Sequence, residues 1–236
     1  MGDKRDGKNE RDVRRLETRL FVGHYSSAFV AKAAAPRVPL WTLLLAAQLV
    51  DILWVLFVFS GIEHVRLVPD LPSNPLDLYH MPYTHSLLAT LVWSAAGFVA
   101  AKQALGLSSR EAAVVAAVVG SHWFLDFLVH RPDLPLLSGP PKLGLGIWNY
   151  PLAAYLLEVI FIGASAWLWF RARVPAGPKR RAWLAFVVGL ILLQTASSFG
   201  PVPSSVNGMI GSGLVLYLLI AWVGERVERF AAPVVA

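Results

Sequence analysis

Histidine and aspartate side chains recur at one-turn spacing in a part of the chain that is otherwise apolar. His122, Asp126 and His130 are four residues apart, so on a helix they form one polar stripe. Ionisable groups at membrane depth are energetically expensive, and a functional site is therefore their first interpretation. Imidazole and carboxylate groups one turn apart can also hold a metal ion on a helix. The alternative is a stripe that only hydrogen-bonds a neighbouring helix.

Four further ionisable side chains lie in other apolar segments: His24, Asp51, His85 and Glu158. Several imidazoles with two carboxylates and no thiolate suit zinc, iron, manganese or nickel. We expect one or two divalent ions, with zinc favoured. A cation in such a centre lowers the pKa of bound water towards neutrality and so prepares a nucleophile for hydrolysis.

Two residues are expected to act beside the metal ligands. Glu158 is a candidate general base or a further ligand. Otherwise it is a protonated acid that hydrogen-bonds Tyr155 or Asn149. His130 lies at the expected membrane surface with Asp133, where the pair can gate the site or support its ligands.

The composition is that of a membrane protein with several spans. Of the 236 residues, 56% are hydrophobic and 15% are charged, whereas a soluble domain has about 25% charged residues. We expect an all-α transmembrane bundle forming one domain over residues 20–236, after a charged tail at residues 1–19. The absence of cysteine excludes disulfides, thiolate ligands and a cysteine nucleophile. The net charge of +6 comes from clusters that bear on topology, and no nucleic-acid partner is expected.

Six apolar segments are interpreted as spans, five of them firm and the last one weaker: residues 40–61, 80–104, 111–130, 148–170, 182–199 and 209–223. Residues 20–35 fall just below the usual spanning length and can form a spanning, re-entrant or interfacial helix before a turn at residues 36–39. Residues 63–79 form a polar loop, in which Glu63 and His64 are interpreted as surface residues. The basic loop at residues 171–181 is expected in the cytoplasm. Because the basic tail has the same preference, the face to which the site opens depends on whether residues 20–35 span.

The candidate residues are expected to lie at one depth. Successive spans run in opposite directions, so the loops after residues 61 and 130 share one face of the membrane. At 1.5 Å per residue, Asp51, His85, His122 and Glu158 lie roughly 8–15 Å below that face. A hairpin about the turn at residues 36–39 would bring His24 level with Asp51. Because these side chains share one depth, we expect them to line one cavity.

Taken in order, the motifs resemble those of a known family. They cover residues 22–126 and are Gly23-His24, Asp51, His80-x-x-x-Thr84-His85-Ser86 and Ser121-His122-x-x-x-Asp126. They are similar to those of bacterial inner-membrane proteins known as membrane-bound metal-dependent hydrolases. That family has a second aspartate after the position of Asp51, where this chain has Leu53. The resemblance implies a bacterial inner-membrane location, hydrolytic activity and a metal site that includes His80.

The leading hypothesis is an integral-membrane metal-dependent hydrolase that acts on an ester, phosphoester or amide. Its substrate would be a small or lipid-like molecule that enters from the lipid bilayer. The expected metal ligands are His24, Asp51, His80, His85, His122 and Asp126. A di-iron oxidase or desaturase is a second possibility, although the paired histidines usual in those enzymes are missing. A third is a transporter or channel for metal ions or protons that uses the same polar cavity.

Overall fold

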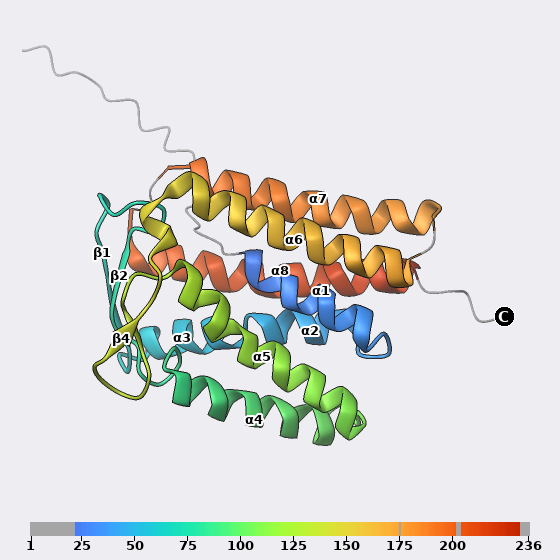
Figure 1. Ribbon diagram of the computed structural model, residues 1–236, viewed down its shortest axis with the longest axis horizontal. Helices are drawn as coiled ribbons and strands as arrows, with labels where there is room; N and C mark the ends of the chain where they lie inside the picture. Colours follow the sequence, from blue (N-terminus) through green and yellow to red (C-terminus); the bar gives the residue numbers. More distant parts are fainter. Residues whose placement is uncertain (1–21, 175, 202–203, 232–236) are drawn as a thin grey trace, which may run out of the picture.

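The computed structural model describes residues 22–174, 176–201 and 204–231, and Figure 1 shows them as a bundle of helices. The charged tail predicted at residues 1–19 lies outside these ranges. In chain order the helices are η1 (Val22–His24), α1 (Tyr25–Ala34), α2 (Leu40–Ala47), α3 (Leu49–Phe59), α4 (Leu87–Gln103), α5 (Ser109–Val129), η2 (Ile147–Asn149), α6 (Pro151–Arg173), α7 (Pro178–Phe199) and α8 (Val206–Ala231). The prediction of an all-α bundle is confirmed.

Four helices are long and apolar enough to cross a membrane, namely α5, α6, α7 and α8. The pair α2 and α3 is bent by 53° and makes a fifth span if the two cross together. Helix α4 is apolar but has only 17 residues. The protein therefore has the helices of a membrane protein, while the predicted number of six spans stays a prediction.

Two predicted helices differ from those observed. The helix expected at residues 40–61 is broken at Gln48, whose φ of −107° and ψ of 6° leave the helical region. The helix expected from residue 80 begins only at Leu87, because Pro82 disfavours helical backbone at the residue before it. Ser86 then caps α4 by accepting a hydrogen bond from the Ala89 amide at 3.0 Å.

Two short hairpins lie at one end of the bundle (Figure 1). Strands β1 (His64–Leu67) and β2 (Leu76–His80) pair antiparallel within the predicted loop between α3 and α4. Strands β3 (Leu134–Pro135) and β4 (Lys142–Leu143) do the same between α5 and α6. This is the end at which α3 and α5 finish and α4 and α6 start, as expected for spans of alternating direction.

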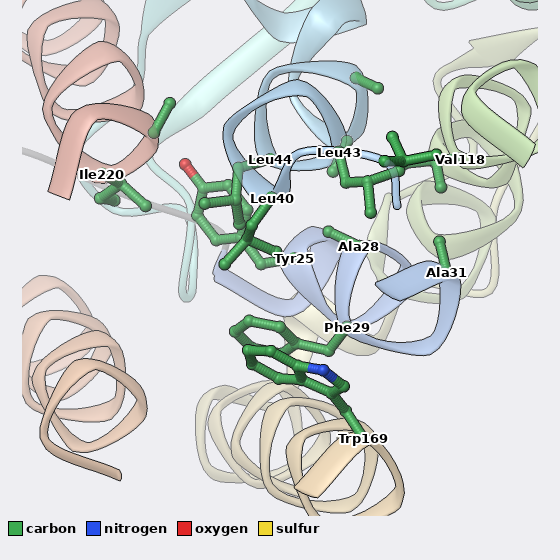
Figure 2. Close-up of a cluster of buried hydrophobic side chains, with 14 of the residues drawn as sticks. Tyr25, Ala28, Phe29, Ala31, Leu40, Leu43, Leu44, Val118, Trp169 and Ile220 are labelled. Atoms are coloured by element: carbon green, nitrogen blue, oxygen red, sulfur yellow. The ribbon is translucent and has the colours of Figure 1, made fainter. Parts of the chain in front are cut away.

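The short helix α1 lies inside the bundle. Figure 2 shows it between α2 and α6, with Tyr25 and Phe29 among the buried side chains. The Phe29 ring stacks on Trp169 of α6 with 5.5 Å between ring centroids. Ten residues make a helix about 15 Å long, about half of a hydrocarbon core. Helices α1 and α2 pack as the expected hairpin, so α1 is a buried half-length helix and not an interfacial one.

Two groups of buried apolar side chains fill the bundle. The larger joins α1 and α2 to the neighbouring helices and includes Val50. The smaller lies towards the hairpins and includes Trp54 and Trp148. Since Val50 and Trp54 are one turn apart in α3, the two groups meet at the level of Asp51.

Candidate metal centre

Five of the six predicted ligands come together at this level. Their ligand atoms form two sets, each with all atoms within 4.8 Å of one another: His24, His122 and Asp126, and Asp51, His85 and His122. The residues come from η1, the first turn of α3, the turn before α4, and α5. Segments separated by about a hundred residues thus meet, as the depth comparison predicted. That they bind a metal stays a prediction.

Asp126 is at the middle of the group. Its Oδ1 atom lies 3.0 Å from His24 Nε2 and 3.4 Å from His130 Nε2. Its Oδ2 atom lies 3.2 Å from His122 Nε2 and 3.7 Å from His85 Nε2. Each carboxylate oxygen is therefore flanked by two imidazole nitrogens. Asp51 Oδ1 adds a further acceptor, 3.3 Å from His85 Nε2 and 3.6 Å from His122 Nε2.

The break between α2 and α3 fixes the tautomer of His122. The last carbonyls of a helix have no partner within the helix, and the Ala47 carbonyl accepts a hydrogen bond from His122 Nδ1 at 2.9 Å. A carbonyl can only accept, so the proton of a neutral His122 is on Nδ1 and Nε2 carries a lone pair. In the described part of the chain, neither His122 Nε2 nor Asp126 Oδ2 has a hydrogen-bond partner, although both are buried.

A second chain of hydrogen bonds fixes His85 in the same way. The Thr84 hydroxyl donates to Glu63 Oε2 at 2.6 Å, so its oxygen is left to accept from His85 Nδ1 at 2.8 Å. Glu63 Oε1 also accepts from the backbone amides of Tyr83 and Thr84. The Nε2 lone pair of His85 consequently faces the two aspartates. Carboxylates that orient ligand histidines through their second nitrogen are common around metal sites.

His130 follows the last residue of α5 and is buried against Trp148, with 4.1 Å between ring centroids. Its Nδ1 donates to Asp133 Oδ1 at 2.8 Å. Burial opposes protonation of the ring, but the carboxylates of Asp126 and Asp133 outweigh it and raise the pKa of His130 to about 9. Any cation that binds at Asp126 competes with that proton.

The spacing of the ligand atoms suits a tetrahedral cation. Ligands at 2.0–2.1 Å from a tetrahedral metal lie about 3.4 Å from one another. The four distances that join the nitrogens of His85 and His122 to the oxygens of Asp51 and Asp126 are 3.2, 3.3, 3.6 and 3.7 Å. Asp51, His85 and His122 therefore form a set compact enough for one zinc-like ion, and Asp126 Oδ2 lies close to the same two nitrogens. The buried atoms of His122 and Asp126 that lack partners are the ones such an ion would satisfy.

The other predicted site residues, His80, His130 and Glu158, lie outside both ligand sets. His80 ends β2, where its ring stacks on His64 with 5.4 Å between centroids. It is separated from the centre because residues 81–86 form turns and not the expected helix. Glu158 accepts a hydrogen bond from the Gly23 amide at 3.2 Å. Neither Tyr155 nor Asn149, the partners considered from the sequence, supplies this bond.

Three contributors were not predicted. Glu63 was interpreted as a surface residue but is 1% exposed, and it orients His85 through Thr84. The Tyr217 hydroxyl of α8 donates to Asp51 Oδ2 at 3.3 Å. The Ala47 carbonyl becomes available at a helix break for which the apolar sequence around Gln48 carries no glycine or proline signal.

A cavity with about 40 Å³ of space for water-sized molecules opens from the centre. Asp51, His85, Asp126 and His130 form its polar wall. The opposite wall is mainly apolar and comes from α3, β2, α8 and Trp148. Among the described residues that line it, none is Lys or Arg. A pocket with a few polar groups and an apolar wall suits a small molecule that has an apolar part.

Comparison with known proteins identifies no relative: no family model, no curated protein and no solved structure matches the chain.

Proposed function

We propose that this chain is an integral-membrane, metal-dependent hydrolase, located in the bacterial inner membrane as the resemblance implies. Asp51, His85, His122 and Asp126 would hold the cation, with zinc favoured by the all-nitrogen and oxygen donor set and by the tetrahedral spacing. When bound, such a cation acidifies water and polarises a carbonyl.

One observation supports this proposal above the others. His122 Nε2 and Asp126 Oδ2 lie 3.2 Å apart in a buried site with no hydrogen bond between them. A nitrogen lone pair this close to a carboxylate oxygen is unfavourable unless a cation lies between the two atoms. His85 presents its Nε2 to the same two aspartates, for the same tautomeric reason. A stripe that only bonded a neighbouring helix would have no need of these unpaired atoms.

The cavity supports a neutral substrate with an apolar part. Sites for phosphate groups commonly use Arg or Lys, and the described lining has neither. An ester or amide of a lipid-like molecule therefore fits better than a phosphoester. Its apolar part would lie along Trp54 and Ile210, with the bond to be cleaved near Asp126. Tyr217 would hold Asp51 in place as a ligand through its hydroxyl.

A transporter or channel has less support. An ion path through the bundle would have to continue beyond the centre towards the α1–α2 turn. That half is filled by packed apolar side chains, among them Tyr25, Phe29, Leu43 and Leu44, all 1% exposed or less (Figure 2).

Elemental analysis of detergent-purified protein tests the proposal. The wild-type protein should carry stoichiometric zinc or another divalent metal, and His122→Ala should lose it together with hydrolysis of acyl ester or amide substrates. His80→Ala is the matched control, because its ring lies outside both ligand sets, and it should keep both properties. Wild-type protein without bound metal, whose activity is unchanged by a chelator, would contradict the proposal.

A further inference from the structure

The two sets of potential ligands share one residue, His122. An imidazole nitrogen has a single lone pair and can bind one cation. His122 Nδ1 is committed to the Ala47 carbonyl, so only Nε2 is left. Both sets cannot therefore be filled through His122. Either the centre holds one cation, or a second cation takes another nitrogen.

His130 supplies that nitrogen. Its Nε2 lies 3.4 Å from Asp126 Oδ1, the same oxygen that lies 3.0 Å from His24 Nε2. We propose that the centre holds two cations bridged by Asp126, the first bound by Asp51, His85, His122 and Oδ2, and the second by His24, His130 and Oδ1. This proposal rests on the proposed metal-dependent function and makes His130 a ligand instead of a catalytic group.

The orientation of His130 matches that of the other ligands. Its Nδ1 donates to Asp133 Oδ1, an acceptor when ionised, so a neutral ring carries its lone pair on Nε2. That nitrogen lies 3.4 Å from Asp126 Oδ1. His85, His122 and His130 thus share one tautomer, with Nδ1 held by an oxygen and Nε2 turned inward. These three nitrogens and the two aspartates make five potential ligands. One four-coordinate cation can use only four of them.

The charges are also balanced by two divalent cations. Asp51 and Asp126 contact the nitrogens directly, while Glu63 and Asp133 are linked to His85 and His130. Together these four carboxylates carry a formal charge of −4. Buried charge that is not compensated costs several kcal/mol per ion, and two divalent ions would remove the imbalance.

The two positions differ in openness. The first cation would have four protein ligands and the second three, so the second would more readily take up water or substrate. Both positions border the cavity, the first through Asp51 and His85 and the second through Asp126 and His130.

The rival arrangement is a single cation with a proton on His130 Nε2, so that the imidazolium bridges Asp126 and Asp133. Metal content separates the two. Detergent-purified wild-type protein loaded with zinc should hold about two equivalents, with a metal–metal distance of about 3.5–4 Å in X-ray absorption spectra. His130→Ala should hold about one and lose the metal–metal signal. His80→Ala should keep both equivalents.

A second variant covers the case in which His130→Ala does not fold. Asp133→Asn keeps an oxygen for His130 Nδ1 but removes the charge, and it should weaken the second equivalent of zinc by about 10–100-fold. The first equivalent should bind as before. One equivalent in the wild type, or two equivalents in His130→Ala, would overturn the two-cation proposal. One equivalent with chelator-sensitive hydrolysis would still support the hydrolase, whereas no metal at all would defeat both.

Discussion

At the scale of single residues, the candidate centre is defined by the second nitrogen of each histidine. Ala47, Thr84 and Asp133 each bind the Nδ1 atom of one ring. In a neutral ring these contacts place the proton on Nδ1 and leave the lone pair on Nε2, the state in which imidazole ligates metals. Replacing any of these oxygens would free the ring to rotate or to exchange tautomers, although the ligand itself would remain.

The contacts of Glu158 bear on whether it is a general base or a residue that positions His24. Its carboxyl group accepts a hydrogen bond from the Gly23 amide at 3.2 Å, in η1. It lines a cavity with Gly23 and His24 that is separate from the one beside Asp51 and His85. The contact suits a residue that positions His24 better than the general base predicted from the sequence.

We therefore expect Glu158→Gln to keep its metal and to hydrolyse substrate within about threefold of the wild-type rate, because the amide oxygen still accepts from Gly23. Glu158→Ala should lose metal affinity, since the buried amide of Gly23 would be left unpaired at a cost of about 1–3 kcal/mol. Metal content and initial rates measure both. A loss of about 10²–10⁴-fold in Glu158→Gln with metal retained would instead establish the general base.

At the scale of elements, the breaks and ends of the helices determine where the candidate ligands lie. The bend between α2 and α3 exposes the Ala47 carbonyl and starts α3 just before Asp51. At the end of α5, the amides of Leu145 and Gly146 donate to the carbonyls of Phe127 and His130. Such contacts satisfy carbonyls that a helix end leaves unpaired, and they fix the place of His130.

Gly144 allows the chain after β4 to lie against the end of α5. Its φ is +153°, and a side chain there would meet the backbone carbonyl oxygens of His130 and Arg131. Only glycine lets the segment after β4 pass this close to the end of α5. Gly23 has a milder version of the same role, since an added Cβ would lie 3.1 Å from Glu158 Cγ.

Helix α8 offers a test of the substrate chamber. Gly213 is buried and lines the cavity, yet a Cβ added there would meet no atom within 4 Å. Gly213→Leu should fold normally, because replacing glycine inside a helix favours the helix by about 0.8 kcal/mol. Its side chain would occupy the chamber. We expect hydrolysis of long-chain esters to fall at least roughly tenfold while short-chain esters and metal content are little changed.

Gly189→Leu is the matched control, since Gly189 lies within α7 on the exposed surface with nothing within 4 Å of an added Cβ. It should behave as the wild type towards all chain lengths. Equal losses for long and short chains in Gly213→Leu, or none for either, would argue that the cavity does not hold the substrate chain.

At the scale of the whole molecule, the centre joins segments that are far apart in the chain. η1, α3, the turn before α4, and α5 all contribute ligand atoms. At the opposite end, Lys32 of α1 donates to the carbonyls of Pro36 and Val38 and pairs with Glu228 of α8. The hairpin of α1 and α2 is thus anchored at both ends, by the polar centre and by this ion pair.

A cation that binds only the folded bundle should stabilise it. At a free concentration 100 times Kd the gain is about 2.7 kcal/mol, which corresponds to an increase in Tm of about 5–10 °C for a chain of this size. We expect a chelator to lower the Tm of the wild-type protein by that amount in a thermal-shift measurement in detergent. His122→Ala should start lower and not respond. Equal responses of the two proteins to the chelator would mean that the effect does not come from this centre.

Much of this organisation follows from the sequence alone. The long apolar runs establish a helical membrane bundle, since in lipid every backbone group must be bonded within a helix or a closed barrel. Alternating span directions then place Asp51, His85 and His122 at one depth, and the expected convergence is observed. These inferences succeed because helix rise and span direction depend only on local geometry.

Only the tertiary structure decided which atoms meet. His80 stacks on His64 outside the centre, Glu63 is buried beside Thr84, and His130 shares an oxygen of Asp126 with His24. None of these contacts follows from spacing along the chain, because each depends on a turn or break whose path is set by packing against other elements. Sequence determines the depth of a side chain in the bundle, while rotation of each helix and the course of each turn decide its partner.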